Sequence, residues 1–457
     1  MPPFPLPLTP FERYYWHDDR PEYPTAYAFE LTFRGRLERE CLERALATVL
    51  GRHPLLTARV ADTKAGPAWV PGTNAPLAID WADAPAPICH PDGPRINLAH
   101  SPGIRPSVRV ADETTLLRLQ IHHACADGLA ALRVIEDVLV AYHACCQAPL
   151  ADPPLPPLAL EALRDRGRLA TPEEEAAYTT AAWLRDQVAG AAEWSRHVLR
   201  PAAPLASPGT CVAPPAEEPP LAFDAATLDE GEVTALRQLA AGAGATWNDL
   251  LLAEWFRTLA RWNARLGRRR GTLRLNVPVS LRPPNETWFS ACNRLTFAFV
   301  DCPASWAFRD DLVARVQSQT QQIKHHRLGH FFVGGLELGF YVPGLVPALL
   351  RRDVCFATAV LSNVGRVLAK APLPRGPDGR LLCGAAVLLR IAAAPPVRPL
   401  TRAALAVMQY AGEATFSLRV DPRALSRADG QSLLADYLDR LRELAASRQP
   451  AESRQVA

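Results

Sequence analysis

Lysine, closely spaced cysteines and long apolar runs are scarce in this sequence, and each scarcity argues against a class of protein. Lysine occurs only at Lys64, Lys324 and Lys370, so nearly all of the 50 basic residues are arginine. The formal net charge is +3, which is too small to indicate a nucleic-acid partner. We interpret the arginine excess as a coding bias rather than as a binding surface.

The ten cysteines form no C-x-x-C pair and have no histidine at zinc-finger spacing. Cys145 and Cys146 are adjacent and cannot readily bridge each other, which is typical of a reduced, cytoplasmic protein. The first ten residues, MPPFPLPLTP, lack a basic region and are broken by prolines, so we expect no signal peptide. Apolar stretches such as 381–389 are too short to span a bilayer.

Length and composition predict two domains, or one large two-lobed unit, with a sizeable core. The chain has 457 residues, of which 48% are hydrophobic and 21% charged. Prolines crowd residues 147–157 and 201–220, and we interpret 148–220 as a connector and crossover. We therefore expect an N-terminal lobe over 1–200, with the connector starting at about 148, and a C-terminal lobe over 220–457.

Seven residues, HHACADG at 122–128, join a predicted strand to a predicted helix. Residues 114–121 alternate apolar and polar side chains as a half-buried strand does, and 129–142 carry apolar residues at helical spacing. Two histidines therefore close a strand, and an aspartate with a glycine opens a helix. Such a corner is a rigid frame that can hold a reactive side chain at fixed geometry.

The rest of the periodicity indicates strands and helices in alternation, which is typical of an α/β protein. Residues 8–25 are expected to form a loop with an aromatic-rich segment, and Thr246 is expected to cap the helix that follows it. Helices are predicted over 37–50, 172–199, 247–266, 308–326 and 426–444, and strands over 26–33, 272–279, 293–300, 354–361, 380–389, 403–410 and 414–420.

HHACADG resembles the HHxxxDG motif of the condensation-domain and acyltransferase superfamily, with both histidines, the aspartate and the glycine in register. That group includes nonribosomal peptide condensation domains, wax ester synthases, plant BAHD acyltransferases and chloramphenicol acetyltransferase. Further segments resemble family motifs in the expected order, so the resemblance spans nearly the whole chain. These segments are RHPLL at 52–56, ATWNDLL at 245–251, VPVSLRP at 277–283, SNVG at 362–365 and QYAGEATFSLRVD at 409–421.

The sequence departs from the family pattern in three places. The DFGWG signature of the BAHD branch is missing. SNVG runs straight into Arg366, where many relatives have proline and glycine. The connector at 148–220 matches no family segment.

The resemblance implies an α/β fold of two chloramphenicol acetyltransferase-like lobes, in which mixed sheets flanked by helices form a pseudo-dimer with a tunnel between them. It also implies transfer of an acyl group from a CoA or carrier-protein thioester to a hydroxyl or amine. The sequence contains no phosphate-binding loop, dinucleotide-binding fingerprint or carrier-protein signature. We therefore expect no bound cofactor or metal, an acyl-CoA or phosphopantetheine thioester as co-substrate, and a monomer that uses a separate carrier protein if it uses one.

The resemblance assigns catalysis to His123, as general base, and a supporting role to His122. Imidazole suits a general base because its ordinary pKa lies near working pH. Strand alternation predicts that the two side chains point opposite ways, so only one faces a given cavity.

The other two fixed positions of the motif are expected to shape the corner. The resemblance implies that Asp127 pairs with an arginine of the second lobe, with Arg282 as the matching candidate and Arg294 as the next. Gly128 is expected to permit a strained corner and close packing of backbone, because it has no Cβ.

Two pairs of residues are candidates for stabilising the oxyanion that develops on the thioester carbonyl. Ser362 and Asn363 are expected in an exposed loop after a strand and carry suitable donors. Alternatively, Asn363 adopts a left-handed turn conformation beside Gly365. Asn293 and Arg294 belong either to the site or to the edge of a sheet.

Four other interpretations of the corner remain open. A buried histidine–aspartate pair can simply tie a strand to a helix. A metal would find at most two ligands on one side, because adjacent histidines on a strand diverge. Cys125 acting as nucleophile, with His123 as base, would give a hydrolase, although position 125 is variable in the family. A noncatalytic condensation-like module would keep the corner to bind a carrier protein or another partner.

Overall fold

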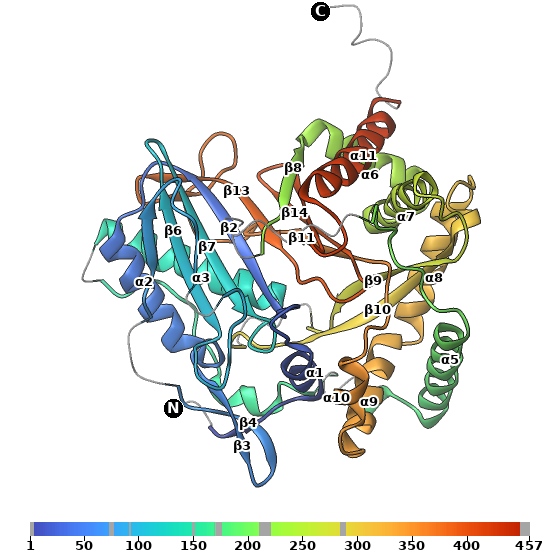
Figure 1. The fold of residues 1–457 in the computed structure, drawn as a ribbon. Helices are drawn as coiled ribbons and strands as arrows, with labels where there is room; N and C mark the ends of the chain where they lie inside the picture. The colour runs from blue at the N-terminus through green and yellow to red at the C-terminus, as the bar shows by residue number, and fades with distance from the viewer. Residues whose placement is uncertain are drawn as a thin grey trace, which may run out of the picture.

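The computed structural model describes residues 4–72, 77–90, 93–148, 151–168, 170, 176–209, 221–283 and 289–447. Two six-stranded sheets, each flanked by helices, lie side by side (Figure 1). Each sheet contributes to its own hydrophobic core, and among the described residues the second core is built from positions between 205 and 445. The mixed α/β, two-lobed fold predicted from the sequence is therefore confirmed.

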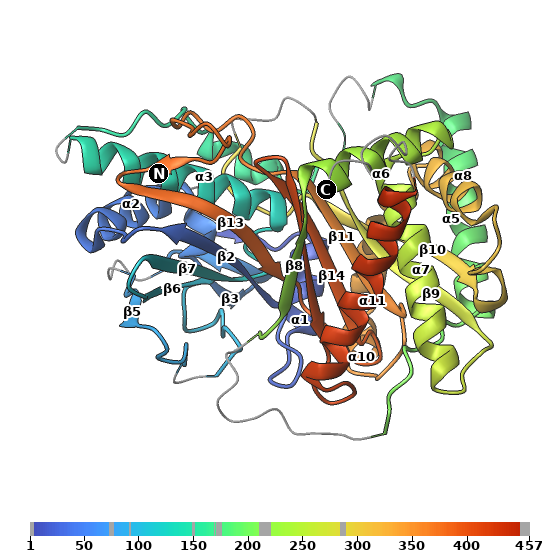
Figure 2. The same ribbon diagram turned by 90° about the horizontal axis from the view of Figure 1, so that it is seen from above.

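The first sheet has the strand order β12-β13-β2-β7-β6-β5. Helices α2 and α3 pack against each other on one face of it (Figure 2). Their bounds and those of the strands are β2 (Ala26–Arg34), α2 (Arg39–Arg52), β5 (Asp80–Asp83), β6 (Ile104–Val110), β7 (Thr114–His122), α3 (Gly128–Gln147), β12 (Leu382–Cys383) and β13 (Ala386–Ala394).

Two strands of this first sheet come from the C-terminal part of the chain. β13 runs antiparallel to β2 along most of its length, with Ile391 opposite Leu31. The hydrogen bonds and cross-strand side-chain contacts of this pair need one strand from each half of the chain. The first sheet therefore depends on both halves. The lobe boundaries at 200 and 220 remain a prediction, but the first sheet is not built from residues 1–200 alone.

The second sheet has the order β10-β9-β11-β14-β15-β8, with α6, α7 and α11 packed on one face (Figure 2). Thr246 caps α7 through a reciprocal capping box with Asp249, as the sequence predicts. The bounds are β8 (Asp224–Leu228), α6 (Glu230–Gly242), α7 (Trp247–Arg265), β9 (Thr272–Ser280), β10 (Leu295–Pro303), β11 (Ala359–Arg366), β14 (Ala403–Tyr410), β15 (Glu413–Val420) and α11 (Arg427–Ala446).

The remaining elements fill the space between and beside the sheets (Figure 1). They are the small sheet of β1 (Leu6–Pro7), β3 (Arg59–Thr63) and β4 (Gly66–Val70), the helices α1 (Pro10–Asp18), α5 (Thr180–Leu199), α8 (Leu312–His325), α9 (Leu328–Tyr341) and α10 (Leu345–Leu350), and the 3₁₀ turns Pro54–Leu56, Leu160–Asp165 and Ala304–Trp306. None of the helices in the described ranges combines the length and apolar character needed to cross a membrane.

The structure contains helices that were not predicted, α6, α9 and α10; the strand predicted over 354–361 begins at Ala359, and the one predicted over 380–389 is divided between β12 and β13. Two further differences lie at the starts of helices. Residues 8–25 were expected to be a loop but contain α1, which begins at Thr9 with a capping box to Glu12. The helix predicted over 172–199 is observed as α5 from Thr180, and residues 171–175 lie outside the described residues. Both differences concern helix starts, which depend on a single capping side chain.

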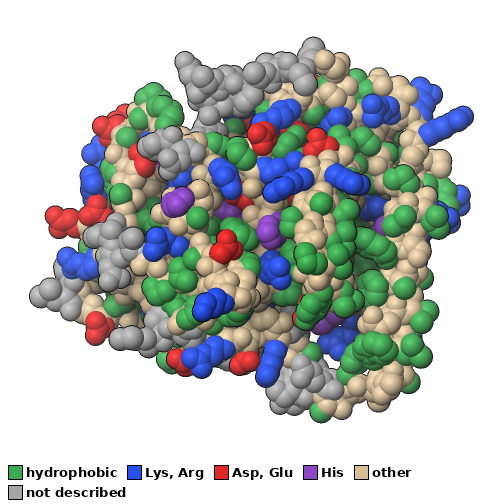
Figure 3. All heavy atoms as spheres, turned by 60° about the horizontal axis from the view of Figure 1, so that its bottom comes forward, with side chains coloured by type: hydrophobic (Ala, Val, Ile, Leu, Met, Phe, Trp, Pro, Cys, Tyr) green, Lys and Arg blue, Asp and Glu red, His purple; other side chains and the backbone are tan. Residues whose placement is uncertain are grey.

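The surface agrees with the small net charge. Figure 3 shows one face on which acidic and basic side chains lie among one another. On the described part of that face there is no field of a single sign that would attract a polyanion.

A buried ion pair joins α1 to the connector. Arg166 donates to both carboxylate oxygens of Glu12, each at 2.7 Å, and the indole N–H of Trp69 donates to the same carboxylate at 3.0 Å. The Glu12 side chain is 0% exposed and that of Arg166 is 2% exposed. Removing one partner of such a pair leaves the other charge buried without compensation.

We expect Arg166→Ala to lower the free energy of unfolding by roughly 3–5 kcal/mol, because it leaves Glu12 charged in the interior. Arg164→Ala is the matched control, since Arg164 pairs with Glu161 at the surface, where both side chains are about two-thirds exposed, and should cost less than about 1 kcal/mol. Urea unfolding measures both changes. Equal losses in the two variants would contradict this account.

Candidate active site

The HHACADG corner lies where β7 ends and α3 begins. β7 pairs with β2 on one side and β6 on the other, so the corner is anchored by a central strand. His122 is the last residue of β7, and Asp127 caps α3 by accepting a hydrogen bond from the Ala130 N–H at 3.0 Å. The strand and helix predicted from the sequence therefore meet at the predicted residues.

His122 is buried and holds the turn in place. Its Nδ1 accepts a hydrogen bond from the Ala124 N–H at 3.0 Å, so the proton of a neutral ring is on Nε2. Nε2 lies 3.4 Å from Thr25 Oγ1 and 3.6 Å from Asp19 Oδ2. Because both ring nitrogens are engaged with protein groups, His122 supports the corner.

Asp19 links this histidine to a cation. Burial alone would raise the pKa of Asp19, but hydrogen bonds from His122, Thr25 and Arg95 hold that pKa below its ordinary value. The Arg95 Nε donates to Asp19 Oδ2 at 2.6 Å. The chain of contacts from Arg95 to His122 fixes the first histidine rigidly.

His123 points into a different environment, as strand alternation predicts, and its side chain is partly accessible. Its ring stacks on Tyr15, with centroids 4.0 Å apart and planes 9° from parallel, and the Tyr27 ring lies 4.8 Å away. The Tyr15 hydroxyl is 3.4 Å from Nε2. Since the rings are nearly parallel, we interpret this contact as stacking rather than as a hydrogen bond along the Nε2 lone pair.

The imidazole of His123 is unprotonated at neutral pH. Burial lowers its pKa to about 4, and the nearby Asp127 carboxylate only partly opposes this shift. The buried Nδ1 has no hydrogen-bond partner among the described residues. A neutral imidazole whose nitrogens are not committed to protein partners can accept a proton from a substrate.

Asp127 is the point at which the second half of the chain contacts the corner. Its Oδ2 accepts from Arg282 Nη1 at 2.7 Å and from the backbone N–H of Arg294 at 2.8 Å. The predicted Asp127–Arg282 ion pair is therefore present, whereas Arg294 contributes its backbone rather than its guanidinium. Residues 284–288, which directly follow the VPVSLRP motif, lie outside the described residues.

Asn293 holds the backbone of the corner. Its side-chain N–H groups donate to the carbonyls of His123 and Ala124. Both amide hydrogens are thus engaged, and the oxyanion role considered for Asn293 does not fit the structure. The structure instead places Asn293 as a clamp from the second half, and its neighbour Arg294 donates from Nη2 to the Arg168 carbonyl at 2.9 Å.

A further contact between the halves involves the RHPLL motif. His53 Nδ1 accepts from the Ala291 N–H at 2.9 Å, and its Nε2 lies 3.2 Å from Asp137 Oδ2. Because Asp137 belongs to α3, this histidine connects α2, α3 and the segment that leads to Asn293.

The expectation for Gly128 was wrong. Its φ is not positive, and a Cβ added there would meet no atom within 4 Å. Gly128 is the first residue of α3, where the backbone has helical geometry and the side-chain position faces open space. A side chain at position 128 would therefore cause neither backbone strain nor a clash, and the glycine leaves the space next to its Cα open.

Cys125 packs as a small buried residue. It is 0% exposed, and a Cβ added to Gly103 would lie 2.1 Å from its Sγ. Burial raises the pKa of this thiol well above its ordinary value. A protonated, inaccessible thiol cannot act as a nucleophile, which argues against the hydrolase interpretation.

The SNVG segment is a bulged strand and not a loop, which corrects the sequence prediction. Ser362 and Asn363 lie in β11, which is parallel to β14, and the register shifts between Asn363 and Gly365. Gly365 has the left-handed conformation (φ +78°), whereas Asn363 does not. Asn363 Oδ1 accepts from the Gly365 N–H at 3.1 Å, and its Nδ2 donates to Asn248 at 3.2 Å.

Within the described ranges, no hydrogen bond, ion pair or ring contact joins Ser362 or Asn363 to the histidine corner. Their part in binding substrate or an oxyanion stays a prediction.

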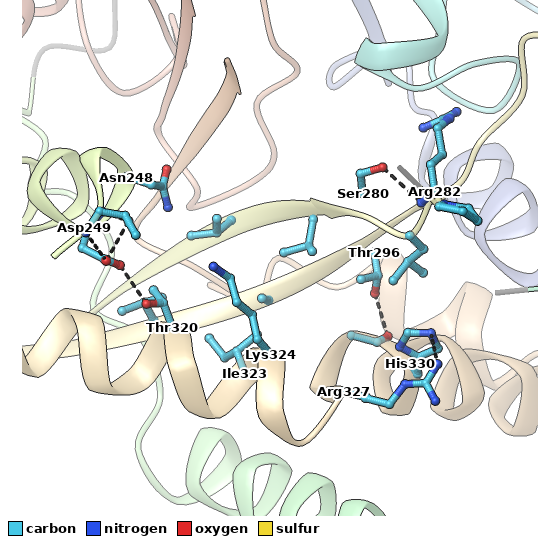
Figure 4. Close-up of a pocket in the computed structure, with 18 of the residues that line it drawn as sticks. Asn248, Asp249, Ser280, Arg282, Thr296, Thr320, Ile323, Lys324, Arg327 and His330 are labelled. Atoms are coloured by element: carbon cyan, nitrogen blue, oxygen red, sulfur yellow. Dashed lines mark hydrogen bonds between the residues drawn. The ribbon is translucent and has the colours of Figure 1, made fainter. Parts of the chain in front are cut away.

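A cavity of about 600 Å³ lies beside β9 and β10 (Figure 4). Figure 4 shows Asn248 and Asp249 toward one end and Arg282 toward the other. Apolar side chains of the two strands, including Val277 and Val279, form much of the wall. Arg282 lines this cavity and also pairs with Asp127, but no residue of the 122–128 corner is among the lining residues.

Sequence reasoning missed the aromatic and charged residues around the histidines. Tyr15, Asp19 and Thr25 come from α1 and the segment after it, and Arg95 comes from a loop. The sequence showed an aromatic-rich segment at 14–16, and a T-x-x-E capping pattern from Thr9 would have identified the helix that presents Tyr15. No local sequence pattern predicts the contact of Tyr15 with His123, because the two residues are 108 positions apart.

No protein-family model matches the chain, and no curated protein matches it. Solved structures do. The first condensation domain of the CDA synthetase is 16% identical, with 98% of this chain and 97% of that chain covered at a TM-score of 0.66. The starter condensation domain of the rhizomide synthetase RzmA, in complex with C8-CoA, is 16% identical, with 97% and 95% covered at 0.64.

The SgcC5 protein from Streptomyces globisporus is 17% identical, with 96% of this chain and 98% of that chain covered at a TM-score of 0.63. Because the identities are only 16–17%, this similarity establishes a shared fold and not a shared function. The chain therefore has the condensation-domain fold over nearly its whole length, as the resemblance implied.

We expect Asp127→Asn to lower the free energy of unfolding by about 2–3 kcal/mol, because Arg282 loses a charged partner while an asparagine still caps α3. Asp378→Asn is the matched control, since Asp378 is 45% exposed and pairs with Arg380 at the surface, where the change should be within about 1 kcal/mol. Urea unfolding measures both. Indistinguishable midpoints would show that the Asp127–Arg282 contact does not stabilise the fold.

Proposed function

We propose that the chain is an acyltransferase that moves an acyl group from a CoA or carrier-protein thioester to a hydroxyl or amine, with His123 as general base. The observation that carries the proposal is the state of this histidine. It is neutral, partly accessible and stacked on Tyr15, while His122 beside it is fully engaged in structural contacts.

The proposed reaction needs one proton acceptor and one leaving thiol. His123 takes the proton from the acceptor O–H or N–H as that atom attacks the thioester carbonyl. Collapse of the tetrahedral intermediate breaks the C–S bond, and the imidazolium returns the proton to the departing sulfur. A positioned base contributes about 10²–10⁴-fold, so orientation of the two substrates must supply much of the remainder.

Tyr15 is the donor best placed to act near the thioester oxygen. Burial, followed by the nearby phenol of Tyr14 and the charge of Asp127, raises the pKa of Tyr15 well above its ordinary value, so its hydroxyl stays protonated. That hydroxyl lies 3.4 Å from His123 Nε2, next to where the reacting atoms would sit. A donor fixed in a desolvated position stabilises developing negative charge.

The choice of a thioester donor is supported by the fold comparison. The rhizomide starter domain, which shares the fold, was solved with an acyl-CoA. We propose the same class of donor for this chain, and no bound cofactor is required by the proposed chemistry.

We expect His123→Ala to lower acyl transfer by about 10²–10⁴-fold while the protein stays folded, because the variant lacks the proton acceptor. The assay follows thiol release from a panel of acyl-CoAs with a thiol-reactive dye, in the presence of alcohol and amine acceptors. His100→Ala is the control, since His100 is an exposed histidine outside the corner.

Undiminished turnover in His123→Ala would exclude the mechanism. If the parent chain releases no thiol from any donor, including acyl groups on a carrier protein, the result would favour the noncatalytic module considered from the sequence.

The pH dependence should report the lowered pKa of His123. In the folded protein that pKa is about 4, compared with the ordinary value of 6.5, so kcat/KM for an alcohol acceptor should not fall as the pH drops through 6.5. Activity should be lost only toward pH 4, where the base becomes protonated. Circular dichroism at each pH controls for unfolding, because the unfolded chain takes up this proton below 6.5 and folding weakens accordingly. An acid limb centred near 6.5 would contradict the assignment.

A further inference from the structure

Three thiols from two helices meet outside the catalytic corner. Cys41 lies in the first turn of α2, and Cys145 and Cys146 lie in the last turn of α3. The Cys145 and Cys146 thiols both lie close enough to the Cys41 thiol to influence its pKa. In the described part of the chain all three are free thiols.

A carboxylate completes the cluster. Glu38 precedes α2 as its N-terminal flanking residue, and one ligand atom each from Glu38, Cys41 and Cys146 lie within 4.8 Å of one another. Donors around a tetrahedral Zn²⁺ are about 3.5–3.8 Å apart, given bonds of about 2.3 Å to sulfur and about 2.0–2.2 Å to oxygen. Small side-chain rotations would therefore bring the three donors to one ion.

The surrounding backbone fixes the cluster. The Tyr142 hydroxyl accepts from the Glu38 N–H at 3.0 Å, which joins the start of α2 to α3. Gly384 covers Cys146 so closely that an added Cβ would lie 2.9 Å from its Sγ. Glu38 is exposed and Cys146 partly accessible, so an ion can enter from solvent on this side.

The chemistry of the donors selects the ion. Thiolate sulfur favours Zn²⁺ and other thiophilic ions over Mg²⁺ or Ca²⁺, which prefer all-oxygen sites. The last turn of α3 presents the negative end of its helix dipole and the first turn of α2 the positive end of its own, so the thiolate and carboxylate donors, rather than the dipoles, favour a cation. Burial raises the pKa of Cys41 and of Cys146, so each thiol releases a proton when it binds the ion.

We propose that Glu38, Cys41 and Cys146 form a binding site for a thiophilic divalent cation such as Zn²⁺, with water in the fourth position. Cys145 lies beside Cys41 and is not one of the proposed ligands. The ion would clamp the start of α2 to the end of α3, far along the helix from Asp127. This site is independent of the proposed acyl transfer.

The test uses the full chain, reduced and freed of metal with a chelator. Co²⁺ titration should produce the near-ultraviolet charge-transfer absorption of thiolate-bound cobalt, and Zn²⁺ should displace it at one ion per chain. Zn²⁺ should also raise the melting temperature until the site is saturated, because the ion binds the folded state. Both readouts are independent of enzymatic activity.

Cys41→Ser and Cys146→Ser should abolish the cobalt absorption and weaken Zn²⁺ binding by more than about 10–100-fold, the usual effect of losing a group that only orients a ligand. Glu38→Gln, at an exposed position that leaves the core intact, should weaken binding while the protein melts normally without metal. Cys89→Ser, at an exposed cysteine outside the cluster, should bind as the parent does.

Absence of thiolate–cobalt absorption in the parent chain would overturn the proposal. So would a Cys146→Ser variant with the cobalt absorption of the parent, or a Glu38→Gln variant with the Zn²⁺ affinity of the parent, since each change removes one proposed ligand without disturbing buried Cys41.

Discussion

The Asp127 carboxylate is the contact on which the site depends. One oxygen satisfies the start of α3, and the other receives the guanidinium of Arg282 and the backbone N–H of Arg294. A buried carboxylate is stable only when its lone pairs are used in this way. The requirement therefore forces the second half of the chain to close on the strand-to-helix corner, and Asn293, next to Arg294, then reaches the His123 carbonyl.

The two histidines lie in different surroundings because the chain leaves β7 at His122 and enters a turn at His123. His122 faces the interior, where Ala124, Thr25 and Asp19 occupy its ring nitrogens. His123 faces the aromatic side chains of Tyr15 and Tyr27, which desolvate its ring without engaging it in a strong hydrogen bond. The corner thus holds one histidine with both ring nitrogens engaged and one whose Nδ1 has no hydrogen-bond partner among the described residues.

Local patterns in the sequence predicted the parts of the structure that local physics determines. The alternation before His122, the helical spacing after Gly128 and the cap at Thr246 all correspond to observed elements. Long-range strand pairings leave no such local pattern. β13 pairs with β2 in the first sheet, where Ile391 lies opposite Leu31, 360 residues earlier in the sequence. The Asn293 clamp and the cysteine cluster arise in the same way, and spacing rules for metal sites cannot find Cys41 beside Cys146. SNVG was misread because a bulge leaves the same glycine signal as a loop.

The low pKa of His123 determines what else an acyl-transfer site here must supply. A shift from 6.5 to about 4 weakens the proton affinity of the base by about 3–4 kcal/mol, since each pKa unit corresponds to about 1.4 kcal/mol. The base is fully available at neutral pH but withdraws the proton with less driving force, so it must act on an acceptor already held against the thioester. In the proposed acyl transfer, rigid placement by Asp127 and Asn293 and a protonated Tyr15 beside the ring are the features that would make such a weak base sufficient.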